Sequence, residues 1–265
     1  MVKKILAQCY IYLMLLVMYL PILLLVVFSF TVSDQVGIWT GFSFQLYVDL
    51  FNNKDLMEAV GNTFLIATVS AIVSTLIGTL GAVGTYYSKK KARKRIETMT
   101  QIPVVNAEIV MALSLAVLFV ALSLKFTFFT LVVGHVVLTV AFVYLNVKPK
   151  LVQMDPNTYE AALDLGATPW FAMFKIILPE ILPGILSGFM IAFTLSLDDF
   201  VLTQYLKEPS FETISTYIQK IVTKHPIPAE VRALTTLLAL AVFASVILIT
   251  IYNNKKANVK VRGRK

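Results

Sequence analysis

Apolar residues gather into six runs along the chain, each long enough to cross a lipid bilayer as a helix. The runs cover residues 10–30, 60–87, 101–124, 128–147, 181–205 and 231–252. A helix needs about 20 mainly apolar residues to cross the hydrocarbon core of a bilayer. The pattern therefore predicts an all-α, polytopic membrane protein in which six transmembrane helices form a single domain, residues 1–265.

Composition supports the membrane assignment and excludes several kinds of chemistry. Of 265 residues, 58% are hydrophobic and 14% are charged, against about 25% charged in an average soluble domain. The single cysteine, Cys9, excludes an intrachain disulfide, and neither His135 nor His225 has the spacing of a zinc ligand. We predict no metal site and no catalytic residue, and we interpret His135 as a packing residue that hydrogen-bonds to a neighbouring helix.

The basic residues define a predicted orientation. With six spans, 17 of the 23 Lys and Arg residues fall on the side that carries both termini, and 6 fall on the other side. The positive-inside rule then places both termini in the cytoplasm. The net charge of +8 lies beside apolar spans, so it indicates topology and membrane lipid rather than a nucleic-acid partner. The first run has a core too long for a signal peptide and is predicted to remain as a helix.

The segment 155–180, between the fourth and fifth runs, contains residues that typically start and end short helices. Asp155 before Pro156 is a typical helix start, and Gly166 is placed to end that helix in the left-handed conformation. Thr168 before Pro169 repeats the start signal. We expect a helix, a turn at Gly166 and a second helix, with Pro179 and Pro183 constraining a turn into the fifth span.

This segment resembles the EAA signature of ABC importer membrane subunits. The stretch "EAALDLGATPWFAMFKIILP" matches it at the positions that define the signature: Glu160, Ala161, Ala162, Gly166, Ile176, Leu178 and Pro179. The resemblance implies a type I ABC importer permease (MetI-like) fold. It also implies that these residues form a coupling helix that sits in a groove on a cytoplasmic ATPase subunit.

The resemblance extends to "FTLSLDDFVLTQY" and "PAEVRALTTLL", which are similar to the PotC-type permeases of spermidine/putrescine importers. It implies a bacterial inner membrane location, a homologous second permease of PotB type and an extracytoplasmic polyamine-binding protein of PotD type. It further implies a dimer of PotA-type ATPase subunits that binds ATP and Mg. The chain itself has no GxxxxGK[ST] loop, so we expect no nucleotide site and no cofactor on it.

Three carboxylates interrupt the predicted spans: Glu108 in the third, and Asp198 and Asp199 in the fifth. An acid at the centre of a membrane helix costs about 2.5 to 3.5 kcal/mol, and neither span contains a Lys or Arg. Adjacent helical positions point about 100° apart. Either one aspartate faces a pathway and the other a neighbouring helix, or the helix is irregular there. A cationic solute would supply the missing charge, with Ser196 adding a hydroxyl, so these residues are the predicted pathway.

Other functions remain open on the residues alone. The aspartate pair could bind the coupling ion of a secondary transporter, or serve an intramembrane enzyme. Permeases for iron, thiamine or phosphonate share the same loop and topology. A run of small residues, "GTLGAVGTYY" at 78–87, predicts close helix packing.

Overall fold

A computed structural model describes residues 2–33, 37–155, 157–223 and 228–244, with side chains from residue 6 onward. Within these ranges all regular secondary structure is helical, which confirms the predicted all-α class. The chain divides into two compact units. One comprises residues 1–57 and 220–265, and the other comprises residues 58–219.

Within the described residues, four helices are long and apolar enough to span a membrane, and a bent helix pair makes up to five. The four cover residues of the first, second, fourth and fifth predicted spans, and the bent pair covers the third. The sixth, 231–252, is described only as far as residue 244, within a helix that begins at residue 230.

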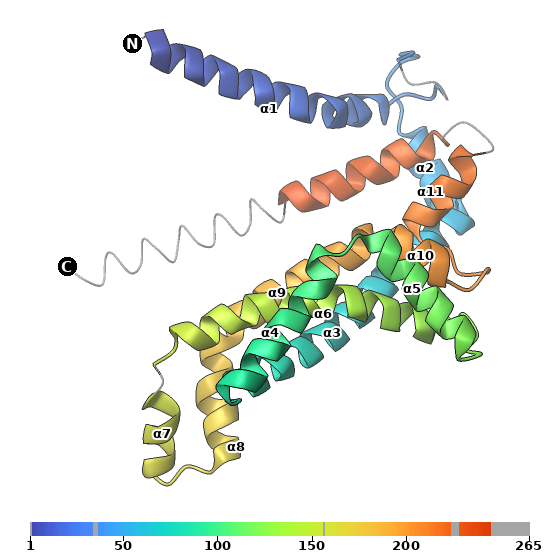
Figure 1. The fold of residues 1–265 in the computed structure, drawn as a ribbon. Helices are drawn as coiled ribbons and strands as arrows, with labels where there is room; N and C mark the ends of the chain where they lie inside the picture. Colours follow the sequence, from blue (N-terminus) through green and yellow to red (C-terminus); the bar gives the residue numbers. More distant parts are fainter. Residues whose placement is uncertain (1, 34–36, 156, 224–227, 245–265) are drawn as a thin grey trace. The chain divides into compact units, whose positions relative to one another are not determined.

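The first unit contains α1 (Val2–Phe28) and α2 (Gln45–Asn52) (Figure 1). Its parts are joined by polar contacts between residues far apart in the sequence. Asn53 Nδ2 donates a 2.9 Å hydrogen bond to Glu230 Oε1, and Arg232 donates to the Ser33 carbonyl. These contacts tie the helix after residue 230 to the segment around α2.

The second unit is built around α6 (Phe128–Gln153), which packs along α9 (Leu178–Asp198). The long helix α3 (Lys54–Tyr86) also packs against α6. The two helices come so close at Gly78 that no side chain would fit there. A Cβ atom at Gly78 would lie 2.7 Å from Val143 Cβ, and one at Gly188 would lie 3.1 Å from Val143 Cα. The close packing predicted for the small residues of α3 is therefore confirmed at Gly78.

The third predicted span is not one straight helix, so the prediction of a continuous helix over 101–124 was wrong. It is divided into α4 (Lys90–Val105) and α5 (Glu108–Ala121), whose axes differ by 105°. Asn106 and Ala107 both have extended backbone (ψ 143° and 134°), so the helical hydrogen-bond ladder stops there. Pro103 weakens the preceding turn because it has no N–H to donate.

The fifth predicted span is also interrupted. Helix α9 ends at Asp198, Asp199 has extended backbone with ψ 131°, and α10 (Val201–Leu206) follows. Of the two arrangements that the sequence left open, the structure thus contains an irregular helix at the aspartate pair. Helix α11 (Ile214–Val222) lies beyond it in the sequence.

The loop after α6 forms α7 (Asn157–Asp164) and α8 (Pro169–Ala172), as predicted. The chain stays helical at Pro179 and Pro183, because α8 continues through the π-helical turn η1 (Met173–Ile177) into α9. The predicted turn into the fifth span is therefore a change in direction of the helix between α8 and α9 (Figure 1). In that turn the Leu178 N–H bonds to the Met173 carbonyl, five residues back. The wider turn accommodates Pro179, which cannot donate to the ladder.

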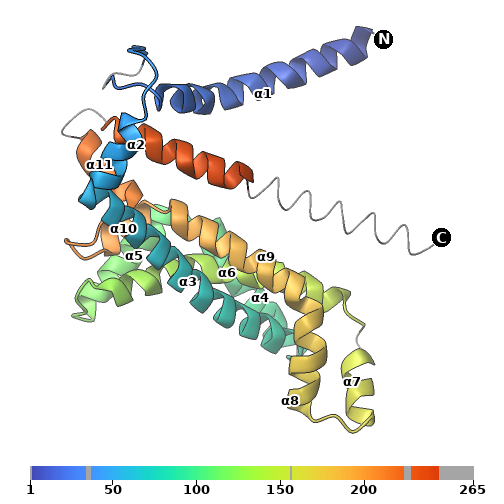
Figure 2. The same ribbon diagram turned by 180° about the vertical axis from the view of Figure 1, so that it is seen from behind.

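Helices α7 and α8 lie at one end of the second unit, and α5 and α10 lie at the other end. Figure 2 shows the same arrangement from behind. Two apolar clusters fill the unit. One joins α3, α6 and α9 around Val143 and Val147, and the other joins α3, α5, α6 and α10 around Leu131 and Leu202.

Candidate functional site

The two helix interruptions bring Glu108 and Asp199 together. Helix α5 packs against α10. Glu108 is the first residue of α5, and Asp199 lies two residues before the first residue of α10. The two carboxyl groups are neighbours that interact electrostatically. Two neighbouring carboxylates repel each other, and binding of a cation, or of a proton in its place, relieves that repulsion.

Asp199 is held in place by the start of the helix that follows it. The residue is buried, with only 5% of its surface exposed. The Leu202 N–H donates to Oδ1 at 3.1 Å, and the Thr203 N–H and hydroxyl donate to Oδ2 at 2.8 and 2.7 Å. The carboxylate therefore caps α10 and satisfies backbone donors that the interruption leaves without helical partners.

His135 bridges the interruption from α6. Its Nδ1 lies 2.7 Å from the Ser196 hydroxyl on α9, and its Nε2 lies 3.1 Å from the Thr203 hydroxyl on α10. Because the Thr203 hydroxyl donates its hydrogen to Asp199, it accepts one from His135 Nε2. A neutral imidazole with its hydrogen on Nε2 satisfies all of these contacts, with Ser196 donating to Nδ1. The predicted hydrogen bonding of His135 to a neighbouring helix is thus confirmed.

The four residues predicted to line the pathway differ in their surroundings. Glu108 is half-buried and Asp198 is exposed, whereas Asp199 and Ser196 are buried. Asp198 is near enough to add to the negative field at Glu108. No Lys or Arg forms an ion pair with these three acids in the described part of the chain. The site consequently presents Glu108 and Asp198 outward, with Asp199 behind them.

Sequence reasoning did not include Thr203, and it did not include Ser74 and Thr139, which extend the polar network. The Ser74 and Thr139 hydroxyls lie 2.6 Å apart, and Thr139 donates to the His135 carbonyl at 2.7 Å. Thr203 follows Asp199 by four positions, the spacing of a residue within reach of a helix cap. The described residues contain no group of three or more His, Cys, Asp or Glu side chains that could hold a metal ion.

The EAA segment forms a second candidate site at the opposite end of the unit (Figure 1). Asp155 Oδ1 accepts from the Asn157 N–H at 2.9 Å, and Thr168 Oγ1 accepts from the Phe171 N–H at 3.3 Å. Gly166 has φ +86°, and the Ala167 N–H bonds to the Ala162 carbonyl at 3.0 Å. This is the Schellman end of a helix, so the predicted left-handed turn is confirmed. The predicted capping by Asp155 and Thr168 is confirmed as well, whereas Pro156, the predicted first helical residue, lies outside the described residues.

The tip of this segment exposes apolar side chains. Leu165 is 89% exposed and Trp170 is 74% exposed, and the Trp170 ring stacks on Phe174. A cavity of about 490 Å³ lies beside them, lined by Ala162, Leu165, Gly166, Ala167, Thr168, Phe171 and Ile176. Exposed apolar patches of this kind mark protein interaction sites.

The signature residues divide between this surface and the interior. Glu160, Ala161 and Pro179 are exposed, Ala162 is buried, and Ile176 and Leu178 are half-buried. Helix α7 is joined to the membrane helices through Tyr159, whose ring lies 5.4 Å from that of Tyr87, just after α3. The contact links the exposed tip to the bundle.

Comparison with known proteins identifies close relatives along most of the chain. Residues 1–255 match the family model described as "Binding-protein-dependent transport system inner membrane component". The chain is 37% identical over 222 residues to the spermidine/putrescine transport system permease protein PotC of Escherichia coli (strain K12). The aligned residues cover 83% of this chain and 83% of PotC. It is 35% identical to the putrescine transport system permease protein PotI of the same strain, over 85% of this chain and 82% of that protein.

Solved structures show the same fold. A chain of a bacterial ABC transporter involved in the import of the acidic polysaccharide alginate superposes with a TM-score of 0.69 at 21% identity, covering 92% of this chain and 96% of the other. A chain from the alginate transporter in complex with an alginate pentasaccharide-bound periplasmic protein gives a TM-score of 0.66, also at 21% identity, over 90% and 93%. Because the identities are low, these likenesses concern the fold alone.

Proposed function

Because the chain belongs to the family of binding-protein-dependent transport system inner membrane components, we propose that it is the permease subunit that carries polyamines in an ABC importer. It is a non-catalytic membrane subunit. The proposed solutes are spermidine and putrescine, the solutes in the names of its relatives PotC and PotI. Permeases for iron, thiamine or phosphonate are the alternatives within the family.

The observation that carries this proposal is the approach of Glu108 and Asp199 at two interrupted helices. Interrupted membrane helices characteristically surround transport sites, because irregular backbone is tolerated where it lines a pathway. Polyamines are flexible chains with several ammonium groups. Glu108 and Asp199 would hold one ammonium, and exposed Asp198 would attract the next. An anionic solute such as a phosphonate would be repelled by the three acids.

His135, Ser196 and Thr203 support the site from behind. The imidazole connects the two halves of the interrupted helix, and Thr203 orients the carboxylate of Asp199. In this proposal Ser196 acts through His135 rather than by touching the solute, because its hydroxyl is buried against the ring. The site is therefore pre-oriented before a solute arrives.

Energy for transport would come from partner subunits. We place the exposed tip of α7 and α8 in a groove on a PotA-like ATPase dimer, which binds ATP and Mg. When the dimer closes, the tip moves with it, and Tyr159 passes the motion to α3 through Tyr87. A PotB-like second permease and a PotD-like binding protein complete the complex, with both termini of this chain in the cytoplasm.

Reconstitution of the complete complex tests this function. Proteoliposomes that contain both permeases and the ATPase are supplied with the binding protein and radiolabelled spermidine or putrescine. We expect uptake that needs internal ATP and binding protein and that excess unlabelled polyamine abolishes. Uptake by this chain alone, driven by a sodium or proton gradient, would instead support a secondary transporter. ATP-dependent uptake of thiamine, iron or phosphonate without polyamine uptake would overturn the choice of solute.

A further inference from the structure

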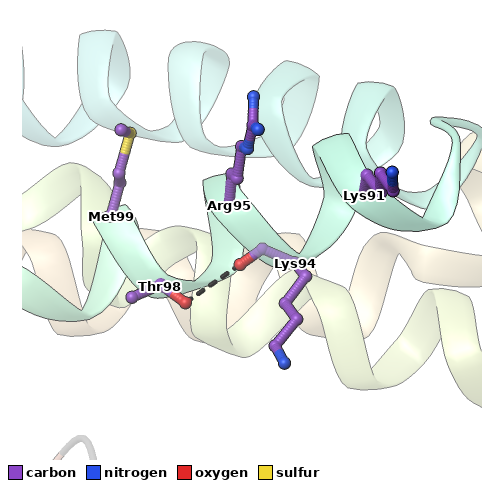
Figure 3. A pocket seen from close by; sticks show the side chains of 5 residues that line it. All are labelled: Lys91, Lys94, Arg95, Thr98 and Met99. Atoms are coloured by element: carbon purple, nitrogen blue, oxygen red, sulfur yellow. Dashed lines mark hydrogen bonds between the residues drawn. The ribbon is translucent and has the colours of Figure 1, made fainter.

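Helix α4 carries a groove that the transport function does not use. Its basic end lies beside a cavity of about 410 Å³ lined by Lys91, Lys94, Arg95, Thr98 and Met99 (Figure 3). Lys91, Arg95 and Met99 are spaced by four residues and so share one face of the helix. In Figure 3, Arg95 and Met99 project to the same side of α4, and Lys94 projects to the other.

The groove is basic at one end of the helix and more apolar toward the other end. A second cavity of about 430 Å³ is lined by Thr98, Gln101, Ile102, Val105 and Asn106, and it shares Thr98 with the first. Met99, Ile102 and Val105 are 66%, 61% and 84% exposed. A basic end is thus followed by an apolar end on a helix with no buried residue. Such a surface matches a ligand that is anionic at one end and apolar along its length.

The cations at the basic end are not neutralised within the described part of the chain. Glu97 is the only acid of α4, and it binds Lys148 of α6 at 2.8 Å and Arg93 at 3.0 Å. Lys91, Lys94 and Arg95 have no ion pair among the described residues. Their charge is therefore available to an anion from outside the chain.

We propose that this groove binds an anionic phospholipid. The headgroup phosphate would lie against Lys91 and Arg95, and an acyl chain would cover Met99, Ile102 and Val105. Helix α4 packs along the membrane-spanning α6, so the groove lies beside a span, where basic pockets collect anionic lipids. An acidic protein or a nucleic acid would satisfy the basic end and leave the apolar end in water.

The sequence supplies a matched control for the test. Lys91→Gln/Arg95→Gln removes two charges from the groove. Lys89→Gln/Lys90→Gln removes two charges from neighbouring positions that do not line it. Both variants have the same net charge, so a difference between them reports the groove rather than the general attraction of basic residues to the membrane surface.

The complete importer complex in nanodiscs of phosphatidylcholine with a small fraction of phosphatidylglycerol allows the measurement. Native mass spectrometry counts the phosphatidylglycerol retained. We expect the Lys91/Arg95 variant to bind about 10- to 30-fold more weakly, from about 1 kcal/mol for each basic residue, and the Lys89/Lys90 variant to match the parent protein.

A second variant tests the apolar end. Met99→Gln/Ile102→Gln should also lower phosphatidylglycerol retention, and soluble glycerol phosphate should fail to displace the lipid. Equal loss in both charge variants, no preference over phosphatidylcholine, or displacement by glycerol phosphate would each overturn the proposal. Crosslinking of position 99 to a partner subunit in place of lipid would overturn it as well.

Discussion

Replacing His135 by leucine removes two buried hydrogen bonds and leaves the Ser196 hydroxyl without its partner. Inside membrane proteins such bonds contribute about 0.6 kcal/mol each and at most about 1.7. A buried polar group without a partner costs about 1 to 3 kcal/mol. We therefore expect His135→Leu to destabilise the protein by about 2 to 4 kcal/mol. The apparent melting temperature of the purified complex should fall by about 5 to 10 °C.

The effect on transport should exceed the effect on stability. Without Nε2–H, the Thr203 hydroxyl is no longer fixed from behind, and the two halves of the helix are no longer joined across Asp199. We expect fewer polyamine molecules imported per ATP hydrolysed, with stimulation of the ATPase by binding protein retained. His135→Gln should recover part of the transport, because its amide can still donate toward Thr203.

A double-mutant cycle checks the reasoning. Ser196→Ala alone should lower stability, whereas Ser196→Ala added to His135→Leu should cost little, giving a coupling of about 1 kcal/mol. Thr194→Ala is the matched control, because it removes a hydroxyl from an exposed position of the same helix that bonds only to the Met190 carbonyl. Additive effects of the His135 and Ser196 changes would refute the bridge across the interruption.

Three further changes test other parts of the structure. Gly166→Ala forces a side chain into a backbone with φ +86° and should cost about 1 kcal/mol, weakening co-purification of the ATPase; unchanged recovery would contradict the role of the turn. Gly78→Ala places a Cβ atom 2.7 Å from Val143 and should lower membrane yield and melting temperature, while Gly84→Ala, which meets no atom within 4 Å, should change neither. Glu97→Gln removes a partly exposed ionic link between α4 and α6 and should cost less than about 1 kcal/mol; a larger loss in thermal melting would show that the link is stronger than its exposure suggests.

The sequence predicted well those elements that depend on residues close to one another in the chain. Apolar runs located the long helices, since burial in lipid requires a length that hydropathy records. Asp155, Thr168 and Gly166 each act within a few residues of their position, through hydrogen bonds or backbone conformation that the residue type itself favours. The predictions at these three residues were confirmed for this reason.

The features that the sequence did not reveal depend on contacts between distant residues. Apolar residues stand on both sides of Asn106 and Ala107, so a hydropathy pattern read over the whole run gave no sign of the 105° bend. Glu108 and Asp199 are 91 positions apart, and only the packing of α5 on α10 brings them together. The helix through Pro179 also contains a π turn, for which the local sequence carried no signal.

The most direct test of the central claim is polyamine uptake by variants that neutralise the paired carboxylates. Glu108→Gln and Asp199→Asn are compared with Glu208→Gln, an exposed acid just after α10 that takes no part in the site. Radiolabelled spermidine uptake is measured in the reconstituted complex at equal permease content. The proposed cation site predicts at least a tenfold lower rate for each paired acid and no change for Glu208→Gln. Near-normal uptake with both paired acids neutralised would contradict it.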